Sequence, residues 1–243
     1  MKRRTFLKSA TLTTAAFGVF PVQMFAASRY SYDDLIGKGN PELFGKGINL
    51  RKEAYEAFVE MRQAAAKEKL DIKIVSSYRD FYRQKAIWER KYKQYTKNGS
   101  TPEQAIQKII EYSTIPGTSR HHWATDIDII DGGATYSGDV LVPEKFHGNG
   151  PFRPLRQWLD ENVNKYGFYM VYTDKPDRKG FKYEPWHYSY APVSVPMLRA
   201  YKKLDVKEII TQEKVAGATH FTDDFIAMYR NENILDINPE LIP

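Results

Sequence analysis

The segment S-R-H-H-W-A-T-D-I-D-I-I, residues 119–130, constrains the fold of this chain more than any other. Its second half alternates aspartate with isoleucine and ends on two isoleucines, which predicts a central β-strand. Its first half follows a chain break at Pro116-Gly117, so we expect a loop that leads into the strand. Two histidines and two aspartates would therefore lie beside the core of a sheet, where polar groups need partners.

Patterns on either side of this segment predict alternating helices and strands. Apolar residues at helical spacing over 50–70 predict an amphipathic helix that covers one face of a sheet. The run D-I-K-I-V-S at 71–76 predicts a strand whose end delivers Ser77, Tyr78 and Arg79. Further helices are expected over about 80–95, 101–112 and 154–166, and further strands over 168–172 and, after a hairpin through 174–180, over 184–187.

The chain is long enough for one well-buried domain with attachments. We expect the main domain over residues 28–195. Helical patterns at about 196–203, 205–213 and 222–230 predict a C-terminal extension, 196–243, that packs on the same domain. No chemical motif lies in that extension.

The first 27 residues are typical of an export signal, with a basic start, the run R-R-T-F-L-K at 3–8 and a mildly apolar stretch after it. The pattern resembles a twin-arginine signal, except that Lys2 stands where Ser or Thr is usual. An ordinary secretory signal or an uncleaved anchor is the alternative. No later stretch approaches the ~20 apolar residues that span a bilayer. We therefore expect an exported protein, periplasmic or extracellular, with no stable membrane span after the signal is removed.

Composition excludes several classes of function. The net charge of +6 includes four basic residues of the signal, and without them 32 basic residues face 30 acidic ones. Nucleic acid is therefore not an expected partner. Separately, we expect the protein to be a monomer. The chain has no cysteine, which excludes a disulfide framework, a thiolate metal site and a cysteine nucleophile. Any metal must be held by histidine and carboxylate.

Two segments offer such ligands. His121 and Asp128 flank the start of the expected central strand, and Glu184 and His187 lie three positions apart around Trp186. A catalytic zinc site needs three protein ligands of this kind and one open position. In an extended strand, Glu184 and His187 would point to opposite faces, so a bend must bring both toward the metal. Taken alone, each pair is more commonly structural than metal-binding.

The combined pattern resembles the D-alanyl-D-alanine metallopeptidases, which include VanY-like carboxypeptidases and VanX-like dipeptidases in a superfamily with lysostaphin and the hedgehog domain. Residues 119–128 are similar to the motif S-x-H-x-x-G-x-A-x-D, and E-P-W-H at 184–187 is similar to E-x-W-H. Residues 76–84, S-S-Y-R-D-F-Y-R-Q, resemble S-G-Y-R-S-x-x-x-Q. The order and spacing of the motifs agree over about residues 50–192.

The resemblance implies a fold and a division of roles. The fold is α+β, with a small antiparallel central sheet flanked by helices. His121, Asp128 and His187 would hold one Zn²⁺, and the register of the first motif excludes His122 as the ligand. Glu184 would act as the catalytic base. The alternative is a structural role, in which Glu184 forms a salt bridge at the surface. Arg79 would contact the substrate carbonyl or the oxyanion, or simply be a solvated arginine at a helix start.

Other matched residues have less specific roles. Ser119 is expected to bind a substrate terminus, or else to cap the loop. Tyr78 and Gln84 are expected substrate contacts, although Gln84 can instead stabilise the helix. Trp186 is expected to pack beneath the metal-binding segment.

The sequence departs from the motif at two positions. Ala124 replaces the glycine, and Asp126 replaces a small alanine. Asp126 and Asp128 alternate along the strand and so face the same side. Asp126 is therefore either a carboxylate that supports a ligand or a competing ligand that changes the charge of the site.

The sequence predicts a zinc carboxypeptidase that removes the terminal D-alanine of peptidoglycan stem peptides. An L,D-carboxypeptidase or a D-Ala-D-Ala dipeptidase of the same family is the alternative within the enzyme class. A zinc-containing module that binds the cell wall without catalysis is the alternative from another class.

Overall fold

The computed structural model describes residues 29–243, so the expected export signal at 1–27 lies outside the described residues. Within residues 29–243, no helix combines the length and the apolar character that a membrane span requires.

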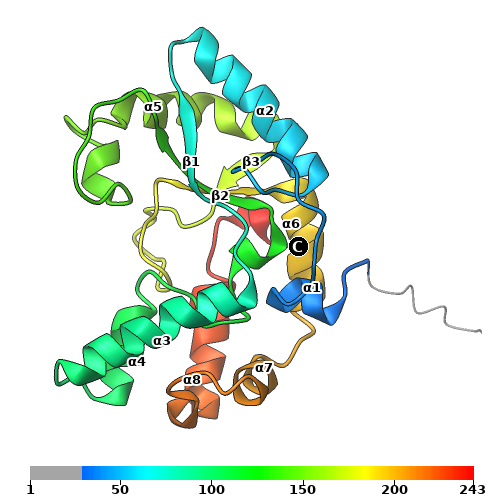
Figure 1. Ribbon diagram of the computed structural model, residues 1–243, viewed down its shortest axis with the longest axis vertical. Coiled ribbons are helices and arrows are strands. Elements are labelled where there is room, and N and C mark those ends of the chain that lie inside the picture. The colour runs from blue at the N-terminus through cyan, green and yellow to red at the C-terminus, as the bar shows by residue number, and fades with distance from the viewer. Residues whose placement is uncertain (1–28) are drawn as a thin grey trace, which may run out of the picture.

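A four-stranded antiparallel sheet lies at the centre of the molecule, with the strand order β1-β2-β4-β3 (Figure 1). Its strands are β1 Ile72–Ser76, β2 Asp126–Asp131, β3 Phe168–Met170 and β4 His187–Tyr190. All residues of β2 are buried, as the alternation of aspartate and isoleucine predicted for a central strand. This confirms the predicted α+β fold with a small antiparallel sheet.

Helices cover one face of the sheet, and further helices form a second group below it. The α-helices are α1 Tyr32–Ile36, α2 Lys52–Lys67, α3 Phe81–Lys97, α4 Pro102–Ile109, α5 Arg153–Asn162, α6 Ala191–Tyr201, α7 Val206–Gln212 and α8 Asp223–Met228. Short 3-10 helices occupy Arg120–Trp123, Pro143–Phe146, Val163–Tyr166, Ala218–His220 and Pro239–Leu241, and a π-helix occupies Tyr229–Ile234.

One face of the sheet packs against α2 and α5, which lie together at the top of Figure 1. The apolar stripe of α2, with Phe58 and Met61, meets Ile127 and Ile129 of β2 in one buried cluster. Because side chains alternate along a strand, Asp126 and Asp128 point to the opposite face. Burial of the isoleucines against α2 therefore determines where the aspartates lie.

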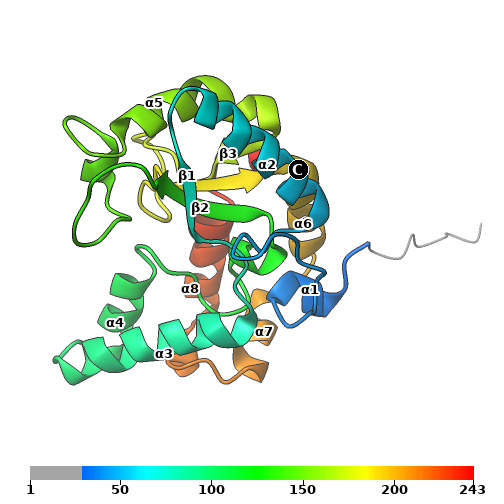
Figure 2. The ribbon, with the colours of Figure 1, turned by 45° about the horizontal axis from the view of Figure 1, so that its top comes forward.

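A second buried cluster joins α3 and α4 to the C-terminal part of the chain. It contains Trp88 of α3, Ile106 of α4 and Leu198 of α6, together with residues of α7 and the π-helix. Figures 1 and 2 show α3, α4, α7 and α8 gathered below the sheet. The polar face of β2 is thus on the side of the sheet that faces this lower group of helices.

Hydrogen bonds tie the C-terminal helices to the segment that precedes the histidines. The buried Tyr229 hydroxyl accepts from the Ile115 backbone N–H at 3.0 Å and lies 2.8 Å from Thr118 Oγ1. The Tyr201 hydroxyl donates to the Gly117 carbonyl at 2.9 Å. These bonds anchor residues 115–118 directly before the metal-binding segment.

Apart from shifts in the ends of several elements, the structure differs from the expected elements in three places that bear on the site or on the domain boundary. The expected loop before β2 contains the 3-10 helix Arg120–Trp123. The expected strand over 184–187 begins only at His187, because Glu184 to His187 form a turn closed by a backbone bond of 3.1 Å. Helix α6 begins at Ala191, so the expected boundary between residues 195 and 196 falls inside a helix.

Ala124 occupies the position of the motif glycine in a left-handed conformation, with φ of 55° and ψ of 37°. Its side chain is fully buried, and its carbonyl accepts from the Arg51 N–H at 2.9 Å. A left-handed residue with a Cβ costs roughly 1–2 kcal/mol, a cost that glycine avoids. The turn into β2 therefore explains why a glycine suits this position.

We predict that Ala124→Gly leaves the free energy of unfolding unchanged or raises it by up to about 1 kcal/mol, because relief of the left-handed strain offsets the entropy of glycine in the unfolded chain. Ala54→Gly, at an equally buried position inside α2, should lose about 1 kcal/mol or more. Urea denaturation of both variants measures the difference. An equal loss in the two variants would contradict the strain at Ala124.

Candidate metal centre and active site

His121, Asp128 and His187 come together in one buried cluster. One potential ligand atom from each residue lies within 4.8 Å of the others. Asp128 on β2 stands directly opposite His187 on β4 in the antiparallel register, and His121 follows from the 3-10 helix before β2. The two imidazole rings stack with centroids 4.8 Å apart. Two imidazoles and one carboxylate are a donor set that suits catalytic zinc.

Each histidine is oriented by a bond from the nitrogen that faces away from the cluster. His121 Nδ1 lies 2.7 Å from the Ser77 carbonyl, which fixes it as the protonated nitrogen. This leaves Nε2 as the free nitrogen, 3.4 Å from Asp128 Oδ2. The end of β1 therefore determines the tautomer in which His121 can bind a metal.

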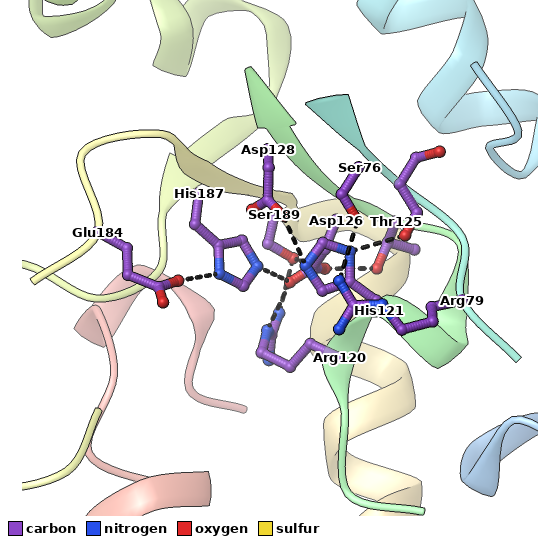
Figure 3. Close-up of polar contacts among 11 residues, drawn as sticks. Ser76, Arg79, Arg120, His121, Thr125, Asp126, Asp128, Glu184, His187 and Ser189 are labelled. Atoms are coloured by element: carbon purple, nitrogen blue, oxygen red, sulfur yellow. Dashed lines mark hydrogen bonds and ion pairs between the residues drawn. The ribbon is translucent and has the colours of Figure 1, made fainter. Parts of the chain in front are cut away.

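His187 is held between two carboxylates, as Figure 3 shows. Its Nε2 lies 3.0 Å from Asp126 Oδ2, and its Nδ1 lies 2.9 Å from Glu184 Oε2. Burial alone would lower the pKa of His187, but these hydrogen bonds raise it to about 10. The surroundings thus strongly favour positive charge at this ring. With Nε2 occupied by Asp126, Nδ1 is the nitrogen that can bind a metal.

Asp126 uses both of its oxygens for contacts other than a metal. Oδ2 also accepts from Arg120 Nε at 3.0 Å, while Oδ1 accepts from Thr125 Oγ1 at 2.8 Å and Ser189 Oγ at 2.6 Å. Burial would raise the pKa of this carboxyl, but Arg120 and His187 hold it well below its usual range. Of the two roles that the sequence left open for Asp126, the geometry favours the support of His187.

Arg120 carries a role that the motif comparison missed. Its guanidinium is buried, donates to Asp126 and to Ser189 Oγ, and lies 4.9 Å from the ring centroid of Trp123. Its positive charge compensates the negative charge of Asp126. The aspartate that replaces the motif alanine therefore adds no net charge beside the ligands. The sequence did contain a signal for this ion pair, because Arg120 lies six residues before Asp126 within the same motif.

Asp128 has an oxygen that a cation would satisfy. Its Oδ1 is buried and has no hydrogen-bond partner among the described residues. Burial would raise the pKa of this carboxyl, but His121 lowers it below its ordinary value, so Asp128 is ionised at neutral pH. A buried carboxylate oxygen without a partner is costly. The residues of this cluster therefore fit a divalent cation.

Glu184 lies beside the ligands and lines the same cavity. The turn at Pro185 brings Glu184 to the same side as His187, whereas an extended strand would have placed the two side chains on opposite faces. Burial raises the pKa of Glu184 above its usual value. The carboxylate is thus a stronger base than one in water.

Arg79 lines the cavity and is held in place by two neighbours. Its Nη1 donates to Gln84 Oε1 at 2.7 Å and its Nη2 donates to Ser76 Oγ at 3.0 Å. Gln84 is fully buried and donates in turn to the Thr114 carbonyl at 2.7 Å. Gln84 is not among the residues that line the cavity and lies behind Arg79, which favours the alternative that it has a supporting role.

The structure separates the remaining expected residues. Ser119 and Trp186 line the cavity. Ser119 makes no side-chain capping bond, so the loop-capping alternative has no support, and Trp186 packs against Phe146 as expected of a supporting residue. Tyr78 lies outside the cavity lining, with its hydroxyl 3.4 Å from the Gly39 carbonyl. The position of Tyr78 therefore gives no support to its expected contact with a substrate, which stays a prediction.

His122 points away from the cluster. It is buried, its Nδ1 lies 2.6 Å from the Arg79 carbonyl, and its Nε2 accepts from the Gly117 N–H. Burial lowers its pKa to about 4, so the ring is neutral. His122 links the segments that carry Arg79 and His121.

The chain matches a known family over most of its central part. Residues 47–193 match the family model described as VanY, D-alanyl-D-alanine carboxypeptidase. A D-alanyl-D-alanine carboxypeptidase of Enterococcus faecalis is 29% identical over 142 residues, which cover 58% of this chain and 48% of the relative. A bifunctional D-Ala-D-Ala dipeptidase and carboxypeptidase of Enterococcus gallinarum is 28% identical, over 59% of this chain and 67% of the relative. This chain thus spans about half the length of the first of these relatives.

Solved structures show the same fold. VanYB in complex with D-alanine-D-alanine has a TM-score of 0.52 at 24% identity, over 72% of this chain and 91% of that one. A variant of the vancomycin-resistance D,D-pentapeptidase VanY in complex with Zn(II) has a TM-score of 0.50 at 26% identity, over 70% of this chain and 90% of that one.

We predict that Asp126→Asn weakens zinc binding by roughly 10- to 100-fold, because the amide no longer fixes the tautomer of His187 and leaves Arg120 without a counter-charge. Competition with a chromophoric chelator measures the affinity. Asp131→Asn is the matched control, since Asp131 is on the same strand and, among residues 29–243, its side chain accepts only from backbone N–H groups in loops. Equal zinc affinity in the two variants would contradict the orienting role of Asp126.

Proposed function

Because this chain belongs to the VanY family of D-alanyl-D-alanine carboxypeptidases, we propose that it is a zinc peptidase that removes the terminal D-alanine of peptidoglycan stem peptides. The observation that carries this proposal is the buried cluster of His121, Asp128 and His187 with the basic carboxylate of Glu184 beside it. One ion is enough for this donor set. When bound, zinc polarises a carbonyl group and lowers the pKa of water toward ~7.

Glu184 is the proposed base. A general base must be unprotonated at rest and basic enough to take a proton from the attacking water. Burial raises the pKa of Glu184, which brings its basicity closer to the working pH. Glu184 then passes the proton to the amine of the departing D-alanine. A step of this kind contributes roughly 10²- to 10⁴-fold in rate.

Arg79 is the proposed donor to the carbonyl oxygen on which negative charge develops. Its guanidinium is positioned in advance by Gln84 and Ser76, so little orientation is lost when the reaction occurs. Arginine keeps its charge at every physiological pH, even where burial lowers its pKa. Ser119, on the same cavity wall, is a proposed hydrogen-bonding partner of the substrate.

The shape of the cavity supports a peptide longer than a dipeptide. Its volume is about 670 Å³, and its lining extends from the ligands to α3 on one side and to the loop 139–144 on the other. A typical ligand site has about 300–1,000 Å³. The reacting bond alone needs only the part beside His121 and Glu184. We therefore favour a carboxypeptidase over a hydrolase of free D-Ala-D-Ala.

Export agrees with this substrate. We propose that the twin-arginine-like signal directs the protein to the periplasm or the exterior, where peptidoglycan lies. The cluster of ligands and base is complete within one chain, which supports a monomer as the active form.

We predict that Glu184→Gln lowers kcat for release of D-alanine from a stem pentapeptide by at least about 10²-fold, since the amide cannot accept a proton. Zinc content, measured by atomic absorption, should stay at one ion per chain. Asp174→Asn, which changes an exposed carboxylate earlier in the connection between β3 and β4, is the control and should keep full activity. Undiminished hydrolysis by Glu184→Gln would show that another group is the base.

Free D-Ala-D-Ala and a stem tetrapeptide, assayed beside the pentapeptide, distinguish the three specificities of the family. We expect the pentapeptide to have the highest kcat/KM. A higher value for the tetrapeptide would establish an L,D-carboxypeptidase, and a higher value for the dipeptide would establish a dipeptidase.

A further inference from the structure

The cavity beside the proposed zinc site has walls of opposite charge. Arg79, at the end of the segment after β1, and Arg90 and Lys91 of α3 line one wall. Asp139 and Glu144, in the loop between β2 and α5, line the other. A negatively charged part of a substrate is therefore attracted to the α3 wall and repelled by the loop wall.

Two of these cations, Arg79 and Lys91, are sheltered from water, and neither forms an ion pair with a carboxylate of the described residues. Arg79 already donates to Gln84 and Ser76, and Arg90 is exposed to water. Lys91 is partly buried, and its Nζ donates to Ser113 Oγ at 2.6 Å. No carboxylate of the described residues forms an ion pair with it. Its ammonium has thus lost part of its hydration and has gained only a hydroxyl group.

Lys91 belongs to the same site as Arg79 and Glu184, because all three line one cavity. Burial lowers its pKa, Arg90 and Arg79 lower it further, and Glu184 raises it. Lys91 also lies seven positions after Gln84 on α3, which is a spacing that returns to the same helix face. The residue that holds Arg79 and the residue that carries the sheltered charge therefore face the same side of the helix.

We propose that Lys91, held in place by Ser113, binds the terminal carboxylate of the peptide substrate. This inference rests on the proposed function, because a carboxypeptidase must recognise the free carboxylate next to the bond that it cleaves. The ion pair restores the interactions that the ammonium lost on burial, and it directs the remainder of the peptide toward the loop wall. Lys91 is thus a specificity-determining residue of the site.

The expected consequence is discrimination between a free and an amidated terminus. Loss of a hydrogen bond to a charged group lowers affinity by roughly 10- to 100-fold. The loss should fall on peptides with a free carboxylate and spare peptides that end in an amide. A merely structural role of Lys91 would weaken both peptides alike.

The experiment measures binding without turnover. Zinc-loaded protein carrying Glu184→Gln is titrated calorimetrically with a stem pentapeptide that ends in free D-Ala-D-Ala, and with the same peptide as its terminal amide. We expect added Lys91→Met to weaken binding of the free acid by roughly 10- to 100-fold and to change binding of the amide by less than about twofold. Lys91→Arg, which keeps the charge, should restore part of the affinity.

Lys93→Met is the matched control, because Lys93 is an exposed lysine of the same helix outside the cavity lining. It should change neither affinity. Thermal melting of each variant shows whether it is folded. An unchanged preference for the free acid in Lys91→Met, an equal loss for both peptides, or no binding of the free acid before substitution would each overturn the inference.

Hydrolysis by the protein with Glu184 intact tests the proposed function separately. If that protein fails to release D-alanine while Lys91→Met still removes the preference for the free acid, the proposed function is wrong and the carboxylate site stands. If D-alanine is released and the preference survives Lys91→Met, the proposed function stands and the carboxylate site is wrong.

Discussion

The antiparallel register of β2 with β4 is the constraint on which the site depends. It places Asp128 directly opposite His187 and Asp126 directly opposite Ser189, all on one face of the sheet. Cross-strand partners of this kind lie only about 4.5–5.5 Å apart at Cβ. A slip of one residue would move both aspartates to the face that packs on α2. Burial of Ile127 and Ile129 in that packing therefore stabilises the register, and with it the arrangement of the ligands.

The acidic residues of the site lie at two depths, some at the cavity and one behind a histidine ligand. Asp128 and Glu184 face the cavity, while Asp126 lies behind His187 and is neutralised by the buried Arg120. A buried carboxylate without such a partner would be strongly destabilising. The Arg120–Asp126 pair therefore lets the protein keep an extra aspartate on β2 and use it to orient an imidazole. Ser189, opposite Asp126, bonds to both members of the pair.

Two layers of helices give the site its walls. The sheet, covered by α2 and α5, carries ligands, whereas α3, which packs on the C-terminal helices, contributes Arg90 and Lys91 to the cavity lining. Figure 2 shows the two groups of helices on either side of the sheet. Tyr201 and Tyr229, from the C-terminal part of the chain, hydrogen-bond the segment 115–118 just before His121. The matched family region ends at residue 193, so these contacts come from outside it. The C-terminal helices thus support the metal-binding segment from below.

The sequence by itself determined the central strand, the flanking helix α2 and the residues that could bind a metal, because alternation and motif spacing are local properties. It also indicated Arg79 and Glu184 by resemblance. It could not decide the role of Asp126, the bend at Glu184 or the position of Gln84 behind Arg79. Each of these depends on contacts between segments far apart in the chain, such as the bond from Asp126 to His187. Only the tertiary structure decided which polar groups meet, since the register of β2 with β4 and the packing of α3 bring them together.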